Sequence, residues 1–109
     1  MELYLELQDK LKDLDISIKE LRRSGTNLAK SERDYKVLLR QECLKLRDEG
    51  MAIGMIDKTC YGIPEVADAR FKRDIANTIY TANLEAINGI KLQIRIIQNQ
   101  LDKEYSNEK

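Results

Sequence analysis

The chain has 109 residues, which allows one domain at most. Charged residues make up 35% of it, yet Lys plus Arg and Asp plus Glu number 19 each, so the formal net charge is zero. This balance excludes strong generic attraction to nucleic acid or to an anionic membrane, and the charge-rich composition with a single proline is typical of long helices.

The N-terminal stretch MELYLELQDK carries acidic residues early and has no apolar core segment, so we do not expect a secretion signal there. No run in the sequence approaches the ~20 apolar residues that are needed to cross a bilayer. We therefore expect a cytoplasmic protein that makes no membrane contact.

A heptad repeat predicts that the first helix covers residues 2–48 with one face toward a partner helix. The repeat steps by three and four through Tyr4, Leu7, Leu11, Leu14, Ile18, Leu21, Gly25, Leu28, Glu32, Tyr35, Leu39, Glu42 and Leu46. The segment RRSGTN at 22–27 keeps the same phase, so we expect the helix to continue through it. The alternative is a break at which Ser24 or Thr26 caps a second helix.

A connecting loop is predicted over residues 49–63, because Gly50 is a typical helix stop and Pro64 a typical helix start. It is longer than most links between helices. Its apolar residues either close the tip of the molecule or dock a partner: Met51, Ile53, Met55, Ile56, Tyr61 and Ile63. With Cys43 inside a helix and Cys60 in the loop, we expect two free thiols that are too far apart to bridge.

The second helix is predicted over residues 64–105 and is followed by a short tail. Its later apolar seam consists of Ile87, Ile90, Ile94, Ile97 and Leu101, and its earlier half continues the apolar face with Phe71, Ile75, Ile79, Ala82 and Ala86. Two such helices predict a single all-α domain over 1–109, a long antiparallel helical hairpin of the coiled-coil type. In that hairpin Leu39 faces Ile75, and Tyr35 faces Ile79.

A second apolar face on this helix indicates self-association. Leu92 and Ile96 point nearly opposite Ile90 and Ile94, and Gly89 lies on their side, where a missing side chain lets another backbone approach. A helix that is apolar on two sides needs two partners. We expect a homo-oligomer, a dimer or higher, that forms a four-helix or larger assembly. The alternative is that Leu92 and Ile96 pack on a bent part of their own hairpin.

The sequence argues against an enzyme. It contains no histidine, which removes the usual general base and the commonest transition-metal ligand. Two isolated cysteines do not make a zinc site, and the segment GMAIG at 50–54 lacks the spacing of a phosphate-binding loop. We assign no catalytic residue, no metal and no cofactor.

Basic residues and tyrosines in two segments form a candidate site for an anion or a nucleotide, since arginine clusters with aromatic rings bind phosphate well. They are Arg33, Tyr35, Lys36, Arg40, Arg70, Lys72, Arg73 and Tyr80. Glu32, Asp34 and Asp74 lie in the same segments, so the alternative is a set of salt bridges between the helices. Direct binding of nucleic acid is not expected, because the chain has one Phe and no Trp.

The region from Leu28 to Tyr105 resembles a group of small proteins encoded by phages and prophages of Gram-positive bacteria. The resemblance rests on Arg33-Asp34-Tyr35-Lys36, Arg47-Asp48-Glu49-Gly50, Arg70-Phe71-Lys72-Arg73-Asp74 and Glu85-Ala86-Ile87-Asn88. Many members end in an Arg-Glu-Trp-like tail, where this chain has Lys103-Glu104-Tyr105. Their genes usually lie in the early region, near recombination and single-strand-binding genes.

The resemblance implies a non-enzymatic helical interaction protein with a phage or host protein as its partner, an accessory to phage DNA replication or recombination. The alternative is an anti-defence protein that binds a host immune protein or sequesters a nucleotide second messenger. In the first case the partner would dock on the connecting loop or on the Leu92 and Ile96 face. In the second, the basic and tyrosine residues would form the site.

Overall fold

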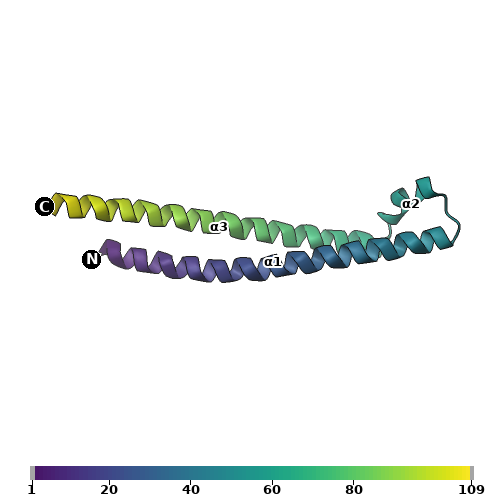
Figure 1. Ribbon diagram of the computed structural model, residues 1–109, viewed down its shortest axis with the longest axis horizontal. Helices are drawn as coiled ribbons and strands as arrows, with labels where there is room; N and C mark the ends of the chain where they lie inside the picture. The colour runs from purple at the N-terminus through teal and green to yellow at the C-terminus, as the bar shows by residue number, and fades with distance from the viewer. Residues whose placement is uncertain (1, 109) are drawn as a thin grey trace. The chain divides into compact units, whose positions relative to one another are not determined.

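A computed structural model describes residues 2–108, which form three helices and, within that range, no strand. Helix α1 spans Glu2–Asp48, α2 spans Ile53–Cys60 and α3 spans Pro64–Glu108 (Figure 1). The all-helical prediction is confirmed, and α1 and α3 begin where the sequence predicted. Helix α3 runs beyond residue 105, through most of the predicted tail. Helix α2 was not predicted.

None of the helices within residues 2–108 combines the length and the apolar character that a membrane crossing requires.

Helix α1 continues without a break through residues 22–27, so the alternative of two separate helices is wrong. This part of α1 packs against α3. Ser24 is buried, and a Cβ atom added to Gly25 would lie 3.5 Å from the Cε2 atom of Tyr80. The Tyr80 ring of α3 therefore packs on α1 beside Gly25.

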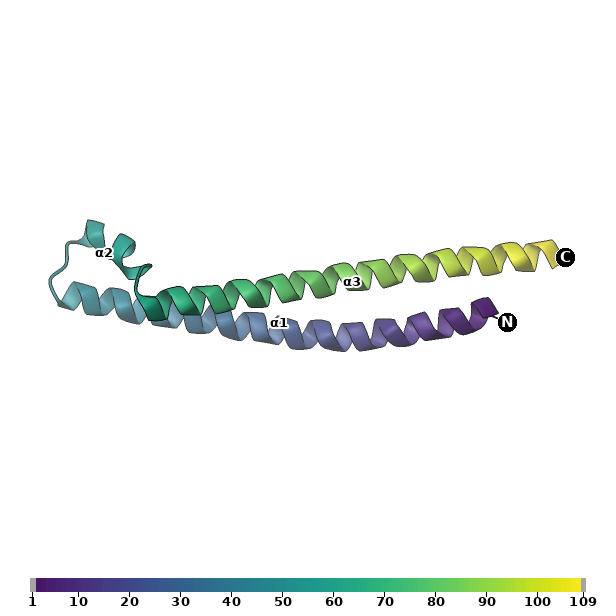
Figure 2. The same cartoon turned by 180° about the vertical axis from the view of Figure 1, so that it is seen from behind.

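The described residues divide into two compact units. The central unit is Ser24–Tyr80, and the terminal unit combines Met1–Arg23 with Thr81–Lys109. Within the central unit, the end of α1 and the start of α3 run antiparallel, and α2 lies beside the end of α1 (Figures 1 and 2). Within the terminal unit, the start of α1 and the end of α3 also run antiparallel.

The end of α1 is fixed by its backbone. Gly50 adopts a φ of +90°, which favours glycine. The Gly50 N–H donates to the Arg47 carbonyl at 3.0 Å, and the Met51 N–H donates to the Leu46 carbonyl at 3.1 Å. These two bonds form the Schellman arrangement, which satisfies carbonyls at the helix end and turns the chain toward α2.

The core of the central unit gathers around Tyr35, Cys60 and Val66. Cys60 and Val66 are fully buried, and Ile56 of α2 is buried as well. Partly buried side chains pack around the three central residues: Leu38, Leu39, Cys43, Leu46, Ile63 and Ala69. The connecting segment therefore supplies core residues, which is one of the two roles that the sequence left open for it.

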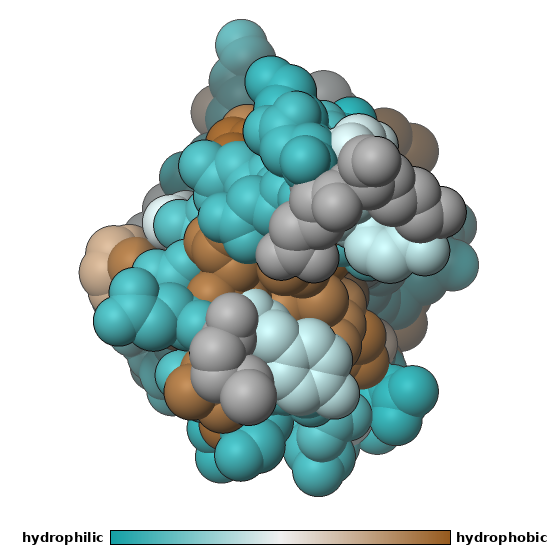
Figure 3. Space-filling model, turned by 90° about the vertical axis from the view of Figure 1, so that its left-hand side faces the viewer, coloured by the Kyte–Doolittle hydropathy of each residue, from teal (hydrophilic) through white to brown (hydrophobic). Residues whose placement is uncertain are grey.

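The core of the terminal unit follows the predicted later seam of α3. Ile87, Ile94 and Ile97 are buried, and Ile90 and Leu101 are half-buried. On α1, the predicted seam residues Leu7, Leu14, Ile18 and Leu21 are half-buried, whereas Tyr4 and Leu11 are exposed. Figure 3 shows apolar surface that reaches the outside between polar side chains at this end of the molecule.

The predicted earlier seam of α3 is wrong. Its members Phe71, Ile75, Ile79, Ala82 and Ala86 are all exposed. Between residues 66 and 86, buried or half-buried positions are Val66, Ala67, Ala69, Arg73, Ala76, Tyr80 and Asn83.

A different pairing of α1 with α3 explains this error. Tyr35 lies against Arg73 and not against Ile79, six residues away, so the predicted pairing of Tyr35 with Ile79 is wrong. Ile75, which was predicted to face Leu39, is exposed. A shift of six residues turns a helix by roughly 240° and presents another face. The shift arises because α2 occupies the connection, which changes where α3 meets α1.

Candidate functional site

The predicted docking residues of the connecting segment differ in their burial. Ile56 is buried and Ile63 is half-buried on the core side. Ile53 is 79% exposed, Met55 54% exposed and Tyr61 44% exposed. Met51 is half-buried. The segment thus closes the tip of the central unit and also leaves apolar side chains open to a partner.

A groove of about 340 Å³ runs where α1 meets α2. Its apolar walls include Leu44 and Ile53, and the Arg40 and Arg47 side chains add positive charge beside Asp57. Cys43 and Ile56 complete the lining. The groove could therefore accept an apolar group that carries a nearby negative charge.

Two cysteines meet at the contact of α1 with α2. The Cys43 Sγ atom lies 3.1 Å from the Cys60 Sγ atom, and the Cys60 thiol donates to the Leu39 carbonyl at 3.5 Å. Both thiols are free. The prediction that they are too far apart to bridge is wrong, because α2 folds back and brings Cys60 onto α1.

Burial raises the pKa of the Cys60 thiol to about 11, since the thiolate would lose its hydration. The contact with Cys43 and the negative charges of Glu42 and Asp57 act in the same direction. Cys60 is therefore a neutral thiol near neutral pH.

Two of the predicted anion-binding residues, Tyr35 and Arg73, are in contact with each other. Tyr35 is buried between the helices, and the guanidinium carbon of Arg73 lies 4.6 Å from the centroid of its ring. Arg73 also donates to Asp74 at 2.8 Å, and this hydrogen bond raises the pKa of its guanidinium. The Tyr35 ring is thus covered by Arg73 and does not offer an open stacking face for a base.

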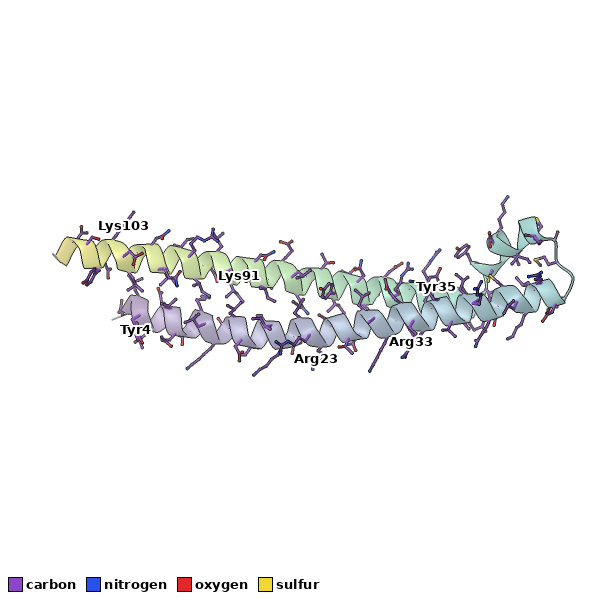
Figure 4. The ribbon with its side chains drawn as sticks, in the orientation of Figure 1. Tyr4, Arg23, Arg33, Tyr35, Lys91 and Lys103 are labelled. Atoms are coloured by element: carbon purple, nitrogen blue, oxygen red, sulfur yellow. The ribbon has the colours of Figure 1, made fainter. Side chains whose placement is uncertain are left out.

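The remaining basic residues lie in different surroundings. Arg33 pairs with Asp34 at 3.2 Å and points away from α3 (Figure 4), and Lys72 pairs with Asp68 at 3.4 Å. These ion pairs lie within helices, not between them. Lys36 and Arg40 line a groove with Cys43, Arg70 is exposed, and Tyr80 packs at Gly25. The structure therefore distributes the predicted anion-binding residues over several locations.

The predicted self-association residues of α3 are open in the terminal unit. Leu92 is 54% exposed and Ile96 48% exposed. A Cβ atom added to Gly89 would meet no atom within 4 Å. Ile96 also lines a groove of about 650 Å³ between α1 and α3, together with Ile16 and the aliphatic stems and charges of neighbouring side chains: Glu6, Asp9, Lys10, Lys12, Asp13, Gln93 and Ile97.

Helix α3 carries a second heptad repeat, of which the sequence predicted only the end at Gly89, Leu92 and Ile96; its beginning was missed. Steps of four and three from Phe71 give Phe71, Ile75, Thr78, Ala82, Glu85, Gly89, Leu92 and Ile96, and all eight residues are exposed. We call these residues the second seam. Its beginning was missed because Phe71 and Ile75 were assigned to the buried face. The signal was present in the spacing, since the second seam and the buried seam follow different phases.

No family model, curated protein or solved structure matches the chain. Among residues 2–108, no group of three or more Cys, Asp or Glu side chains is arranged to hold a metal ion.

Proposed function

We propose that the chain is a non-enzymatic helical interaction protein that associates with a second copy of itself through the second seam of α3. The observation that carries the proposal is the exposure of Leu92 and Ile96, at 54% and 48%. Ile96 lies about 200° around the helix from Ile94, which is buried. The helix is thus apolar on two sides, and α1 covers only one of them.

The geometry of this face supports a second copy as the occupant. Contact between the same face on both copies closes into a two-fold dimer, the commonest oligomer.

Gly89 supports close packing of helices at this face. A glycine inside a helix is less favourable than alanine by about 1 kcal/mol. Nothing within the chain lies near the position of its missing side chain. A second helix that approaches the backbone at Gly89 would give this residue a structural role.

We further propose that a protein partner docks at the exposed apolar residues of the connecting segment, Ile53, Met55 and Tyr61. What supports this is their exposure beside a groove with apolar walls. The resemblance to phage early-region proteins supports an accessory role in phage DNA replication or recombination in the host cytoplasm.

Analytical ultracentrifugation of a Leu92→Asp, Ile96→Asp double variant tests self-association. We expect the wild type to sediment above its monomer mass of 12.7 kDa and the double variant to sediment at that mass. The matched control is a Val37→Asp, Leu44→Asp double variant, which adds the same charge at two side chains of α1 that are each 50% exposed. The proposal fails if both double variants keep the mass of the wild type.

A pull-down from host cells, with and without phage infection, tests the partner. We expect one dominant protein that the wild type retains and an Ile53→Asp, Met55→Asp variant loses. If that variant still retains the same protein, the partner does not dock at Ile53 and Met55.

A further inference from the structure

The end of α2 brings together two thiols that are separated by 17 residues in the sequence. Their Sγ atoms are 3.1 Å apart, whereas the S–S bond of a disulfide is about 2.05 Å. An approach of about 1 Å is within the range of a small side-chain rotation. Cys43 lies within α1, five residues before its end at Asp48, and Cys60 is the last residue of α2, so both backbones are held in place.

We propose that Cys43 and Cys60 form a thiol-modification site, a dithiol that a small disulfide of the oxidised-glutathione class converts into an intramolecular disulfide between α1 and α2. This inference does not depend on self-association or on the proposed partner.

The surroundings assign a different role to each thiol. Cys43 is half-buried and lines both grooves beside α2, so a small disulfide can reach it. Arg40 lines both grooves and Arg47 one of them, and their positive charge attracts the carboxylates of glutathione. Cys60 is fully buried and its thiol stays protonated. Attack therefore starts at Cys43.

The reaction is a pair of thiol–disulfide exchanges. In the first, the Cys43 thiolate attacks one sulfur of oxidised glutathione, a mixed disulfide forms, and one glutathione thiolate leaves and takes a proton from water. In the second, Cys60 loses its proton and its thiolate attacks the Cys43 Sγ atom, which displaces the second glutathione. The two cysteines are oxidised by two electrons, and one oxidised glutathione becomes two reduced glutathiones.

The second exchange is favoured by proximity. The Cys60 Sγ atom is already in contact with the sulfur that it must attack, so the step is intramolecular. The raised pKa of Cys60 slows this step but does not prevent it, because a small thiolate fraction is enough when the reacting atoms are held together. The mixed disulfide is thus a short-lived intermediate in the wild type.

The test treats the purified full chain, folded and reduced, with oxidised glutathione, and then measures its intact mass and its non-reduced peptide map. We expect the wild type to lose both thiols together and two hydrogens in mass, and to show a Cys43–Cys60 linked peptide with no second chain attached. A Cys60→Ser variant is expected to gain one glutathione at Cys43 and to keep it. A Cys43→Ser variant is expected to keep its Cys60 thiol unmodified while folded.

The measurement on the wild-type chain tests the proposal by itself. A variant that fails to fold therefore does not affect the outcome. A stable glutathione adduct on the wild type would overturn it, as would two unmodified thiols after treatment. A disulfide between two chains in place of the internal one would overturn it as well.

Discussion

The guanidinium carbon of Arg73 lies 4.6 Å from the centroid of the Tyr35 ring, and this contact joins α3 to α1 inside the central unit. It sets which residues of the two helices face each other, because it pairs a charged residue of α3 with a buried aromatic ring of α1. It also directs Phe71 and Ile75 to the outside.

Truncation of Tyr35 should destabilise the fold strongly. Its ring is buried, so Tyr35→Ala is expected to lower the free energy of unfolding by about 3 to 5 kcal/mol, the range seen for buried aromatic residues. Arg73→Ala should lower it by about 1 kcal/mol through loss of the cation–π contact. Tyr4→Ala is the control, since this ring is 53% exposed and its removal should change the value by about 0.5 kcal/mol or less. Urea unfolding followed by circular dichroism gives all three values, and an equal effect at Tyr35 and Tyr4 would contradict the assigned pairing.

Two glycines should respond in opposite ways to alanine. At Gly25 the new Cβ would lie 3.5 Å from the Tyr80 ring, an ordinary contact, so Gly25→Ala should stabilise the helix by about 0.5 to 1 kcal/mol. At Gly50 the φ of +90° strains any side chain, so Gly50→Ala should destabilise by about 1 kcal/mol or more. Thermal melts of the two variants provide the comparison. A stabilising Gly50→Ala would show that α1 does not end in the described turn.

The two isoleucines of α2 should differ in their importance for stability. Ile56 is 8% exposed, so Ile56→Ala should lower the free energy of unfolding by about 2 to 4 kcal/mol. Ile53 is 79% exposed, so the same substitution there should change it by about 0.5 kcal/mol or less. The pair is matched, because both isoleucines belong to the same short helix. Denaturant unfolding measures the difference, and similar losses at the two positions would mean that α2 does not pack as described.

Alkaline pH should weaken the fold through Cys60. Its folded pKa is raised to about 11, above the ~8.5 of an unfolded cysteine. Between these values the unfolded chain loses the proton while the folded chain keeps it, so stability is fully present below about pH 8.5 and falls as the pH rises toward 11. Unfolding curves between pH 7.5 and about 10.5 measure the slope. In Cys60→Ala the free energy of unfolding should depend less on pH over this range. If the pH dependence is unchanged in that variant, it arises from other titrating groups.

The long helices were predictable from the sequence because the heptad repeat continues over many turns and Gly50 and Pro64 mark clear ends. The later seam of α3 was predictable for the same reason, since Ile87, Ile90, Ile94, Ile97 and Leu101 follow one another in steps of three and four. Helix α2 was not predictable in this way. Only two of its eight residues, Ile56 and Cys60, are buried against the core. Two positions are too few to reveal a helical repeat in the sequence.

The pairing of α1 with α3 could not be derived from the sequence without α2. Once a short helix occupies the connection, the facing positions change, and the earlier apolar residues of α3 move to the surface. The meeting of Cys43 and Cys60 depends on the same fold-back. The second seam, in contrast, was visible as a regular spacing from Phe71 to Ile96, but assigning it to the surface required knowledge of which face α1 covers.

Sedimentation equilibrium of the wild-type chain over a wide range of concentrations tests the central claim most directly. The proposed association through the second seam predicts a mass of at least twice 12.7 kDa at high concentration, with dissociation on dilution and loss of the larger species in Leu92→Asp, Ile96→Asp. A mass of 12.7 kDa at every concentration would contradict it.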